Sequence, residues 1–334
     1  MKKYNPNFQD PRIKRRVNTS LDWALACTSP TKPRAWSTRH IDTVFGNQGN
    51  RLSKMIRQLL LTTHSSYYNP QTGKAKQYLL NVAGASQLAS HVGRDVNTKN
   101  LHSQRCTSAD TLYGEQIAQG AFEYTEKSNR LWNDIQFLEN DIRKPLFENY
   151  GYIHEYDIRT AAPTLLYQLA QQHRTKPLPA VKDYVDHSRE HRQLLSERIG
   201  VDVNTAKRLI TARFAGARFG AMNAIARELQ GRWVAYERLK TDHWFNTVSK
   251  EIVEMWSVIK SSEDLPRLTA RIKWNIYFRE ELRVMRSVHS SLNKQGITYF
   301  HEHDGWRSRE AVDMRKLKLH VNKQTGYWVD FECG

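Results

Sequence analysis

The chain is poor in cysteine. It has three cysteines, Cys27, Cys106 and Cys333, which lie far apart and form no CxxC pair. This number is too small for a disulfide framework or a cysteine-rich zinc site, and it is typical of a reducing compartment. His102 and Cys106 have the spacing of neighbours on a helix, but two ligands do not make a zinc site.

Long hydrophobic runs are also lacking. No apolar stretch approaches the roughly 18–20 residues that cross a bilayer. The first segment, MKKYNPNFQDPRIKRR, is charged and has no apolar core of the kind found in secretory signals. We therefore expect no membrane association and a cytoplasmic location. We find no internal repeat and no low-complexity segment, and the 39% hydrophobic content is that of an ordinary globular protein.

Acidic residues are scarce relative to basic ones. The chain has 34 Asp and Glu against 51 Lys and Arg, which gives a net charge of +17. Such a chain attracts polyanions, and the phosphate backbone of nucleic acid is the commonest cytoplasmic polyanion. The charge therefore indicates nucleic acid as the partner, although a merely basic surface has the same composition. It does not indicate which chemistry the protein performs.

Local patterns divide the chain near residue 150. Residues 1–50 are polar and basic with little periodicity, and we expect a basic, mostly helical region over 1–150. The patterns in this region predict a short cationic arm at Arg12–Arg16, an amphipathic helix over Arg51–Leu61, a turn over Asn69–Gly73 and helical structure over 110–147 with Asp110 as its N-cap.

The second half of the chain alternates strand and helix patterns. The segment YIHEYD (152–157) is β-prone and ends on Asp157, and the apolar spacing after it, with Pro163 in the first turn, predicts a helix. The other predicted elements are helices over 179–198, from 204 and over 264–293, a strand over 297–303, a helix near 308–316, and a β-hairpin made of LKLHV, NKQTG and YWVDFE (317–332).

Two acids, Asp157 and Asp304, end predicted strands. Phosphoryl transfer to a 3′-hydroxyl uses two Mg²⁺ ions, and Mg²⁺ prefers carboxylate oxygens together with phosphate and water. The protein then needs to supply only about two rigidly placed carboxylates, and strand ends that meet across a sheet can hold them. Strand-terminal Asp residues are also common turn formers, so the pair alone is a weak indication.

Three segments resemble the motifs of right-hand nucleic-acid polymerases. DIRTAAPTLL (157–166) resembles motif A, in which an acid ends a strand before an apolar helix, and its form is most similar to family B DNA polymerases. KRLITARFAGARFG (207–220) resembles motif B on the fingers helix. The helix, Gly turn and strand that end in ITYFHEHDG (297–305) resemble motif C of family A polymerases. The order A, B, C is similar to that of family A DNA polymerases and single-subunit phage RNA polymerases.

This resemblance implies an α+β right-hand polymerase fold over 151–334. The palm would be a small antiparallel sheet of strands near 152–158, 297–303 and 317–331, and the fingers would be the helices over about 179–260. Residues 1–150 would be a thumb-like or template-binding region. A chain of 334 residues leaves no room for a proofreading exonuclease, and its compactness suits a phage or plasmid replicon in a bacterial host cytoplasm.

The implied reaction is template-directed nucleotidyl transfer, in a small polymerase or primase-polymerase acting in DNA replication. Its cofactor would be Mg²⁺ (two ions, with Mn²⁺ as a substitute), and its partners would be a DNA or RNA template and nucleoside triphosphates. The resemblance makes Asp157 and Asp304 the catalytic residues and, with Ile158, the metal ligands. Alternatives are a dedicated single-subunit RNA polymerase or primase, and a non-catalytic nucleic-acid-binding replication protein. A binding protein has no reason to bring the two acids together.

The motif B segment implies a set of nucleotide-binding residues. On a continuous helix the cations and an aromatic ring would face the same side, as nucleotide delivery requires. A basic surface helix would show the same pattern. The candidate triphosphate ligands are Lys207 and Arg208, with Arg213 in reserve, and Phe219 and Gly220 complete the nucleotide-binding set.

The residues around Asp304 leave several roles open. His303 would either position the primer end or pack, and Glu302 would assist it or be solvated. Gly305 stands where DNA-synthesising family A enzymes often have Glu, whereas phage RNA polymerases have a small residue there. HEHD (301–304) also permits a zinc or hydrolase metal cluster with His301 and His303 on one strand face, but no further Cys or His cluster completes it.

Ala162 is the candidate sugar gate. It occupies the place where similar DNA polymerases carry a bulky side chain that excludes the ribose 2′-hydroxyl. An alanine leaves room for that hydroxyl and favours ribonucleotide use, as in an RNA polymerase, a primase or a primase-polymerase. The alternative is that Ala162 only packs on the apolar face of its helix.

Overall fold

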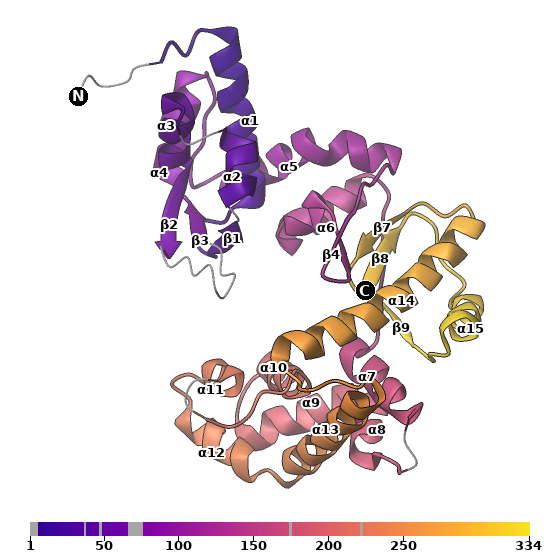
Figure 1. The fold of residues 1–334 in the computed structure, drawn as a ribbon. Coiled ribbons are helices and arrows are strands. Elements are labelled where there is room, and N and C mark those ends of the chain that lie inside the picture. Colours follow the sequence, from indigo (N-terminus) through magenta and orange to yellow (C-terminus); the bar gives the residue numbers. More distant parts are fainter. Residues whose placement is uncertain (1–5, 37, 47–48, 66–75, 174–175, 221–222) are drawn as a thin grey trace. The chain divides into compact units, whose positions relative to one another are not determined.

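The chain forms two compact units in a computed structural model that describes residues 6–36, 38–46, 49–65, 76–173, 176–220 and 223–334 (Figure 1). The first unit is Met1–Tyr124 with Asn133–Ile153, and the second is Thr125–Trp132 with His154–Gly334. The fold class is α+β, as the sequence predicts, with many helices and small antiparallel sheets. No helix in the described parts of the chain is both long and apolar enough to span a membrane.

The first unit packs helices around a three-stranded antiparallel sheet with the order β1-β3-β2. We expected a mostly helical region and missed this sheet, because its strands are too short to show a clear alternation of apolar and polar residues. Its elements are α1 (Pro11–Cys27), β1 (Arg34–Trp36), α2 (Thr38–Phe45), α3 (Arg51–Leu60), β2 (Leu61–Ser65), β3 (Lys76–Leu80), α4 (Val82–His91), α5 (Leu101–Gln119), a 3₁₀-helix (Asp134–Phe137) and α6 (Asn140–Asn149).

Helix α1 replaces the irregular cationic arm that we expected. The Asp10 carboxylate accepts a hydrogen bond from the Arg12 backbone N–H, and Pro11 occupies the first turn. An Asp N-cap followed by Pro is a strong start signal for a helix. The helix then buries Val17 and Leu21, so the polar composition of this segment concealed one apolar stripe.

The other local predictions in this unit have mixed outcomes. The helix predicted over Arg51–Leu61 is confirmed as α3, and the turn predicted over Asn69–Gly73 lies outside the described residues. The placement of Asp110 as an N-cap is wrong, since it lies inside α5, which ends where Gly120 adopts a left-handed φ of 66°. The helical prediction over 110–147 is wrong between Gly120 and Asn133, where the chain forms a two-stranded hairpin, and it is confirmed again over 140–147, which belong to α6.

The second unit contains a four-stranded antiparallel sheet with the order β7-β8-β6-β9. It also includes the two-stranded hairpin β4–β5, which precedes the rest of the unit in the sequence. Its elements are β4 (Thr125–Lys127), β5 (Arg130–Trp132), β6 (His154–Ile158), α7 (Ala161–Gln171), α8 (Pro179–Asp186), α9 (Ser188–Ile199), α10 (Val203–Phe214), α11 (Ala224–Glu228), α12 (Trp233–Thr241), α13 (His243–Ser262), α14 (Ala270–Lys294), β7 (Tyr299–Glu302), β8 (Gly305–Ser308), α15 (Met314–Thr325) and β9 (Phe331–Cys333).

The strand and helix that surround Asp157 are confirmed as β6 and α7, and the strand before Asp304 is confirmed as β7. The C-terminal hairpin prediction is wrong. LKLHV and NKQTG belong to α15, which Asp313 caps by accepting from the Lys316 backbone N–H. The helix predicted near 308–316 is wrong at its start, because Gly305–Ser308 forms β8.

Two predictions about the helices of this unit also need correction. The single helix predicted over 179–198 is two helices, α8 and α9, which meet at His187. The continuous helix assumed for 207–220 is wrong, because α10 ends at Phe214 and Gly216 follows with a left-handed φ of 92°. Residues 218–220 therefore do not continue the face of α10.

The sheet and the long helices of this unit share one hydrophobic core. Trp306 of β8 is fully buried and stacks on Tyr156 of β6, with ring centroids 4.9 Å apart. Helix α7 packs against α13 and α14, and Leu165 of α7 and Met285 of α14 are fully buried. This packing fixes the start of α7, and hence the end of β6, relative to the sheet.

Candidate active site

Antiparallel pairing of β6 with β8 brings Asp157 and Asp304 together. Asp157 lies opposite Gly305 in the strand register, and the Ile158 backbone N–H donates to the Asp304 carbonyl oxygen at 2.9 Å. Asp304 itself lies in the tight turn between β7 and β8. Residues far apart in the sequence are thus held on adjacent strands by backbone hydrogen bonds, which gives the two acids a rigid support.

The backbone is strained on both sides of this acid pair. His303, directly before Asp304, has a φ of 52°, and Thr160, at the start of α7, also has a φ of 52°. A left-handed conformation is unfavourable for a β-branched residue such as Thr and costs about 1–3 kcal/mol. The Thr160 hydroxyl lies 2.7 Å from the Ser188 hydroxyl, which helps to hold it. Strain of this kind is concentrated at functional sites in proteins.

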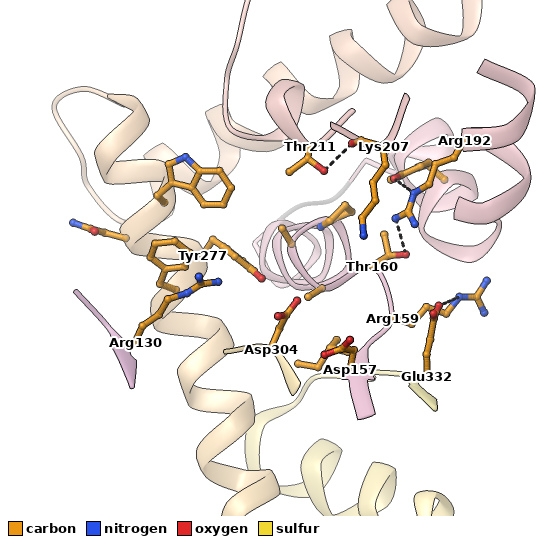
Figure 2. Close-up of a pocket in the computed structure, with 18 of the residues that line it drawn as sticks. Arg130, Asp157, Arg159, Thr160, Arg192, Lys207, Thr211, Tyr277, Asp304 and Glu332 are labelled. Atoms are coloured by element: carbon orange, nitrogen blue, oxygen red, sulfur yellow. Dashed lines mark hydrogen bonds and ion pairs between the residues drawn. The ribbon is translucent and has the colours of Figure 1, made fainter. Parts of the chain in front are cut away.

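The two acids lie at one side of a pocket of about 690 Å³. This volume is within the range of ligand sites in proteins. Figure 2 shows the carboxylates of Asp157 and Asp304 directed into the pocket, with Lys207 reaching toward them from α10. The remaining walls come from the start of α7, from α9 and α14, and from the β4–β5 hairpin.

Neither carboxylate has a cationic partner among the described residues, since Asp157 and Asp304 form none of the ion pairs in those parts of the chain. Burial and then the charge of Asp304 raise the pKa of Asp157 to about 7. Burial also raises the pKa of Asp304. The Asp157 side chain is exposed to the pocket, and Asp304 is half-buried. Two uncompensated carboxylates side by side are costly unless a cation binds between them.

Five cationic side chains line the same pocket, alongside the carboxylates of Asp157, Asp304 and Glu332. Arg130 is fixed by a bidentate pair with Glu281 at 2.8 and 2.7 Å and lies 3.8 Å from the centroid of the Phe278 ring. Lys207 forms no ion pair with the described residues. The cations are Arg130, Arg159, Arg192, Lys207 and Arg271. The same pocket thus brings carboxylates and cations together: Arg192, Lys207 and Arg271 lie on helices, Arg130 lies on the β4–β5 hairpin and Arg159 lies between β6 and α7.

Gly305 is required by its close approach to Asp157. A Cβ atom at position 305 would lie 2.1 Å from the Asp157 Oδ1 and 2.3 Å from the Tyr156 carbonyl oxygen. Both distances are below van der Waals contact, so any side chain would displace the carboxylate or the strand. A Glu at this position is incompatible with the observed arrangement of the acids.

We expect Gly305→Ala to lower the free energy of unfolding by about 1–3 kcal/mol, the usual cost of overpacking. Part of this loss of stability comes from the clash with the Asp157 carboxylate. In a protein that already carries Asp157→Ala, Gly305→Ala should therefore be less destabilising. Urea unfolding of the wild type, both single variants and the double variant measures this coupling. Additive effects of the two substitutions would contradict the contact.

The five nucleotide-binding candidates of the motif B segment do not lie together in the structure. Of the five nucleotide-binding candidates, Lys207 is the one that lines the pocket, together with Thr211 of the same segment. Arg208 pairs with Glu228 at 2.5 Å, outside the pocket lining. Arg213 donates to the carbonyl oxygens of Ala217 and Ser249 at 2.6 and 3.1 Å. The two remaining residues lie beside α12: Phe219 packs edge-on against Tyr236, and the Gly220 N–H donates to the Tyr236 hydroxyl.

The acids next to the catalytic candidates have a structural partner. Arg307 of β8 is buried and pairs with Glu155 at 2.7 Å and with Glu302 at 3.1 Å. The His303 ring packs edge-on against Trp132 of the hairpin, with centroids 4.8 Å apart. Glu302 thus has a charge partner and the His303 ring is packed, and the second contact ties the turn that carries Asp304 to the β4–β5 hairpin.

Two further candidates, the predicted metal ligand Ile158 and the predicted sugar gate Ala162, also line the pocket. Ile158 and Ala162 both contribute to its wall, and Ala162 lies in the first turn of α7. His301, the other residue of the HEHD alternative, is buried against His289, and burial lowers its pKa. The described residues contain no group of three or more His, Cys, Asp or Glu side chains placed to hold a metal ion.

Several pocket residues were not predicted from the sequence. Arg130 lies on the hairpin in the first half of the chain, and Arg192, Arg271 and Tyr277 lie on α9 and α14. They share no local motif, so only the tertiary fold brings them together. Arg159 differs from these residues. It follows Asp157 by two positions, so its presence in the pocket could have been predicted from the sequence.

The donor set suits a hard cation. Two carboxylates are oxygen ligands of the kind that Mg²⁺ takes from proteins, usually with water and substrate phosphate completing its shell. Comparison with protein-family models, with curated proteins and with solved structures finds no match to this chain.

Proposed function

We propose that this protein is a template-directed nucleotidyltransferase in which Asp157 and Asp304 hold two Mg²⁺ ions. The observation that carries the proposal is the juxtaposition of two carboxylates that form no ion pair with the described residues, one near the end of β6 and one in the β7–β8 turn, in a pocket lined by five cations. Carboxylates for metal and cations for phosphate are the parts that phosphoryl transfer requires. A protein that only binds nucleic acid gains nothing from two adjacent carboxylates in a pocket.

In this proposal each part of the second unit has a role. The sheet β7-β8-β6-β9 is the palm, and helices α8–α13 are the fingers. The attacking hydroxyl releases its proton to water, its oxygen forms a bond to the α-phosphorus, the bond from that phosphorus to the bridging oxygen breaks, and pyrophosphate leaves. Bound Mg²⁺ would supply Lewis acidity for this step.

In this proposal, side chains that line the pocket position the nucleoside triphosphate. Lys207 faces the acid pair (Figure 2) and binds triphosphate oxygens, while Arg192 and Arg271 extend the cationic lining of the pocket. Arg192 is oriented by its hydrogen bond to the Tyr184 hydroxyl at 3.0 Å. The position of Ala162 in the pocket wall supports room for a ribose 2′-hydroxyl, so we include NTPs among the substrates.

The proposal is tested by an extension assay. Purified protein is incubated with Mg²⁺ on primed and unprimed DNA and RNA templates, with dNTPs and NTPs supplied separately. Template-dependent products support the proposal, and the pairs that give product identify template, primer requirement and sugar. A protein that binds these templates but yields no product with either Mg²⁺ or Mn²⁺ would be a non-catalytic binding protein.

The raised pKa of Asp157 predicts a pH dependence that the metal controls. Because the pKa of metal-free Asp157 is about 7, protons compete with Mg²⁺ for this carboxylate as the pH falls. We expect activity to be lost below about pH 7 at low Mg²⁺, and the midpoint to move down by about one pH unit per tenfold increase in Mg²⁺ while one proton competes with one ion. Rates measured across pH at several Mg²⁺ concentrations test this. A midpoint independent of Mg²⁺ would contradict it.

A further inference from the structure

A large aromatic side chain is exposed outside the pocket that contains Asp157 and Asp304. Trp233, the first residue of α12, is 70% exposed. Its ring stacks on Tyr236, with centroids 5.5 Å apart and an interplanar angle of 17°. Exposure of so much apolar area is unfavourable in water, and an exposed ring held at a fixed orientation is typical of a binding surface.

The aromatic contacts continue inward from Trp233. Tyr236 packs edge-on against Phe219 at 5.8 Å, and Phe219 packs against the buried Phe245 of α13 at 6.1 Å. The Tyr236 hydroxyl accepts a hydrogen bond from the Gly220 N–H at 3.0 Å. We call Trp233, Tyr236 and Phe219 the aromatic row. Because its inner end is anchored in the core, its outer ring is supported rather than loose.

A basic pocket of about 710 Å³ begins where the aromatic row ends. It is lined by Phe219 together with Arg213, Arg218, Asn246, Ser249, Lys250 and Val253, and no carboxylate is among these side chains. Arg218 and Lys250 form no ion pair with the described residues. Burial, and then repulsion by Arg213 and Arg218, lowers the pKa of the neighbouring Lys273 to about 8. A bound anion would offset the repulsion within this group of like charges.

We propose that the aromatic row and the basic pocket bind single-stranded nucleic acid, with an unpaired base stacked on Trp233 and backbone phosphates at Arg218 and Lys250. Stacking rings beside a cationic groove are the features by which proteins hold single strands, since every base has a face to stack and every nucleotide a phosphate. A duplex hides its base faces, so it fits the row poorly. An acidic peptide would use the cations but not the exposed ring.

The proposal takes its ligand class from the proposed function, but it is tested by binding without turnover. Anisotropy of a fluorescein-labelled dT₂₀ strand and of a matched duplex is measured with full-length wild type and variants at physiological salt. We expect Trp233→Ala to weaken dT₂₀ binding about tenfold, the loss that one stacked base brings, and Trp233→Phe to keep most of the affinity. Duplex binding should change less than about twofold, because a duplex offers no free base face.

Matched controls separate the surface from general effects. Trp328→Ala removes another exposed tryptophan, 60% exposed and held by Gln168 of α7. Arg315→Ala/Lys323→Ala on α15 removes the same charge as Arg218→Ala/Lys250→Ala. Trp233→Ala should weaken dT₂₀ binding more than Trp328→Ala does, and Arg218→Ala/Lys250→Ala should weaken it more than Arg315→Ala/Lys323→Ala does. The affinity of Arg218→Ala/Lys250→Ala for dT₂₀ should also depend less steeply on salt concentration.

The outcomes distinguish this proposal from the proposed function. Unchanged dT₂₀ binding by Trp233→Ala, or equal losses in Trp233→Ala and Trp328→Ala, overturns the binding surface even if the wild type extends primers. A selective loss in Trp233→Ala supports the surface even if the wild type extends none.

Discussion

Replacing Asp157 or Asp304 with Ala is expected to lower nucleotide incorporation by at least roughly 10³-fold, while the fold and nucleic-acid binding persist. Each substitution removes one of two protein carboxylates that would hold the metal, and loss of a single group that stabilises transition-state charge already costs about 10²–10³-fold. The measurement is single-turnover extension at saturating template. Asp304→Asn should be nearly as inactive as Asp304→Ala, because the neutral amide keeps the shape but not the charge.

Stability measurements provide a second readout of the same substitutions. The pKa of Asp157 is raised because its charge is unfavourable in the metal-free pocket. Asp157→Ala should therefore not lower the free energy of unfolding in the presence of EDTA. Glu310→Ala is the matched control, since it removes an exposed acid of the same unit that lies outside the pocket lining. If template binding falls in parallel with activity, the acids have a structural role instead.

The sequence was informative where local pattern and tertiary packing agree. The strand before Asp157 and the helix after it were predicted from a β-prone run and from apolar spacing with Pro163 in the first turn, and β6 and α7 confirm them. The same holds for β7. The pairing of the two acids was predicted from the resemblance to motifs A and C, because strand-terminal Asp residues alone are common turn formers.

The C-terminal tail shows where pattern reading failed. LKLHV alternates apolar and polar residues, which favours a strand, but Leu317 and Val321 also have the spacing of one helix face. Both are fully buried in α15, whose ends are fixed by the Asp313 cap and by Gly326 with a φ of 76°. The cap and the glycine were stronger signals than five alternating residues.

Strand β8 could not be predicted from its residues. Its sequence, GWRS, begins with glycine and contains an arginine, a composition that is unusual for a central strand. Arg307 is buried there only because Glu155 and Glu302 on the neighbouring strands compensate its charge. The cationic lining of the pocket could not be predicted from the sequence either. Arg130, Arg192 and Arg271 lie far apart in the chain and come together only in the folded protein.

Sugar choice at Ala162 is the second large effect that we expect. Ala162 lies in the pocket wall near Thr211 and Tyr277, and the space behind it, toward Leu166 and Trp256, amounts to only about 10 Å³. That space holds about one water molecule and cannot accept a phenol ring. A Tyr side chain at position 162 must therefore extend into the large pocket, where the incoming sugar would lie.

We expect Ala162→Tyr and Ala162→Glu to reduce NTP incorporation about a hundredfold relative to dNTP incorporation, since each 1.36 kcal/mol of steric cost in the transition state is a factor of ten in rate. The ratio of kcat/KM for NTP and dNTP on one template measures the effect. Ala162→Ser is the control, because it adds a polar atom without bulk and should keep the wild-type ratio. If wild type rejects NTPs strongly, Ala162 does not discriminate the sugar. If the bulky variants lose both substrates equally, the side chain serves the packing of α7 and the alignment with motif A is displaced.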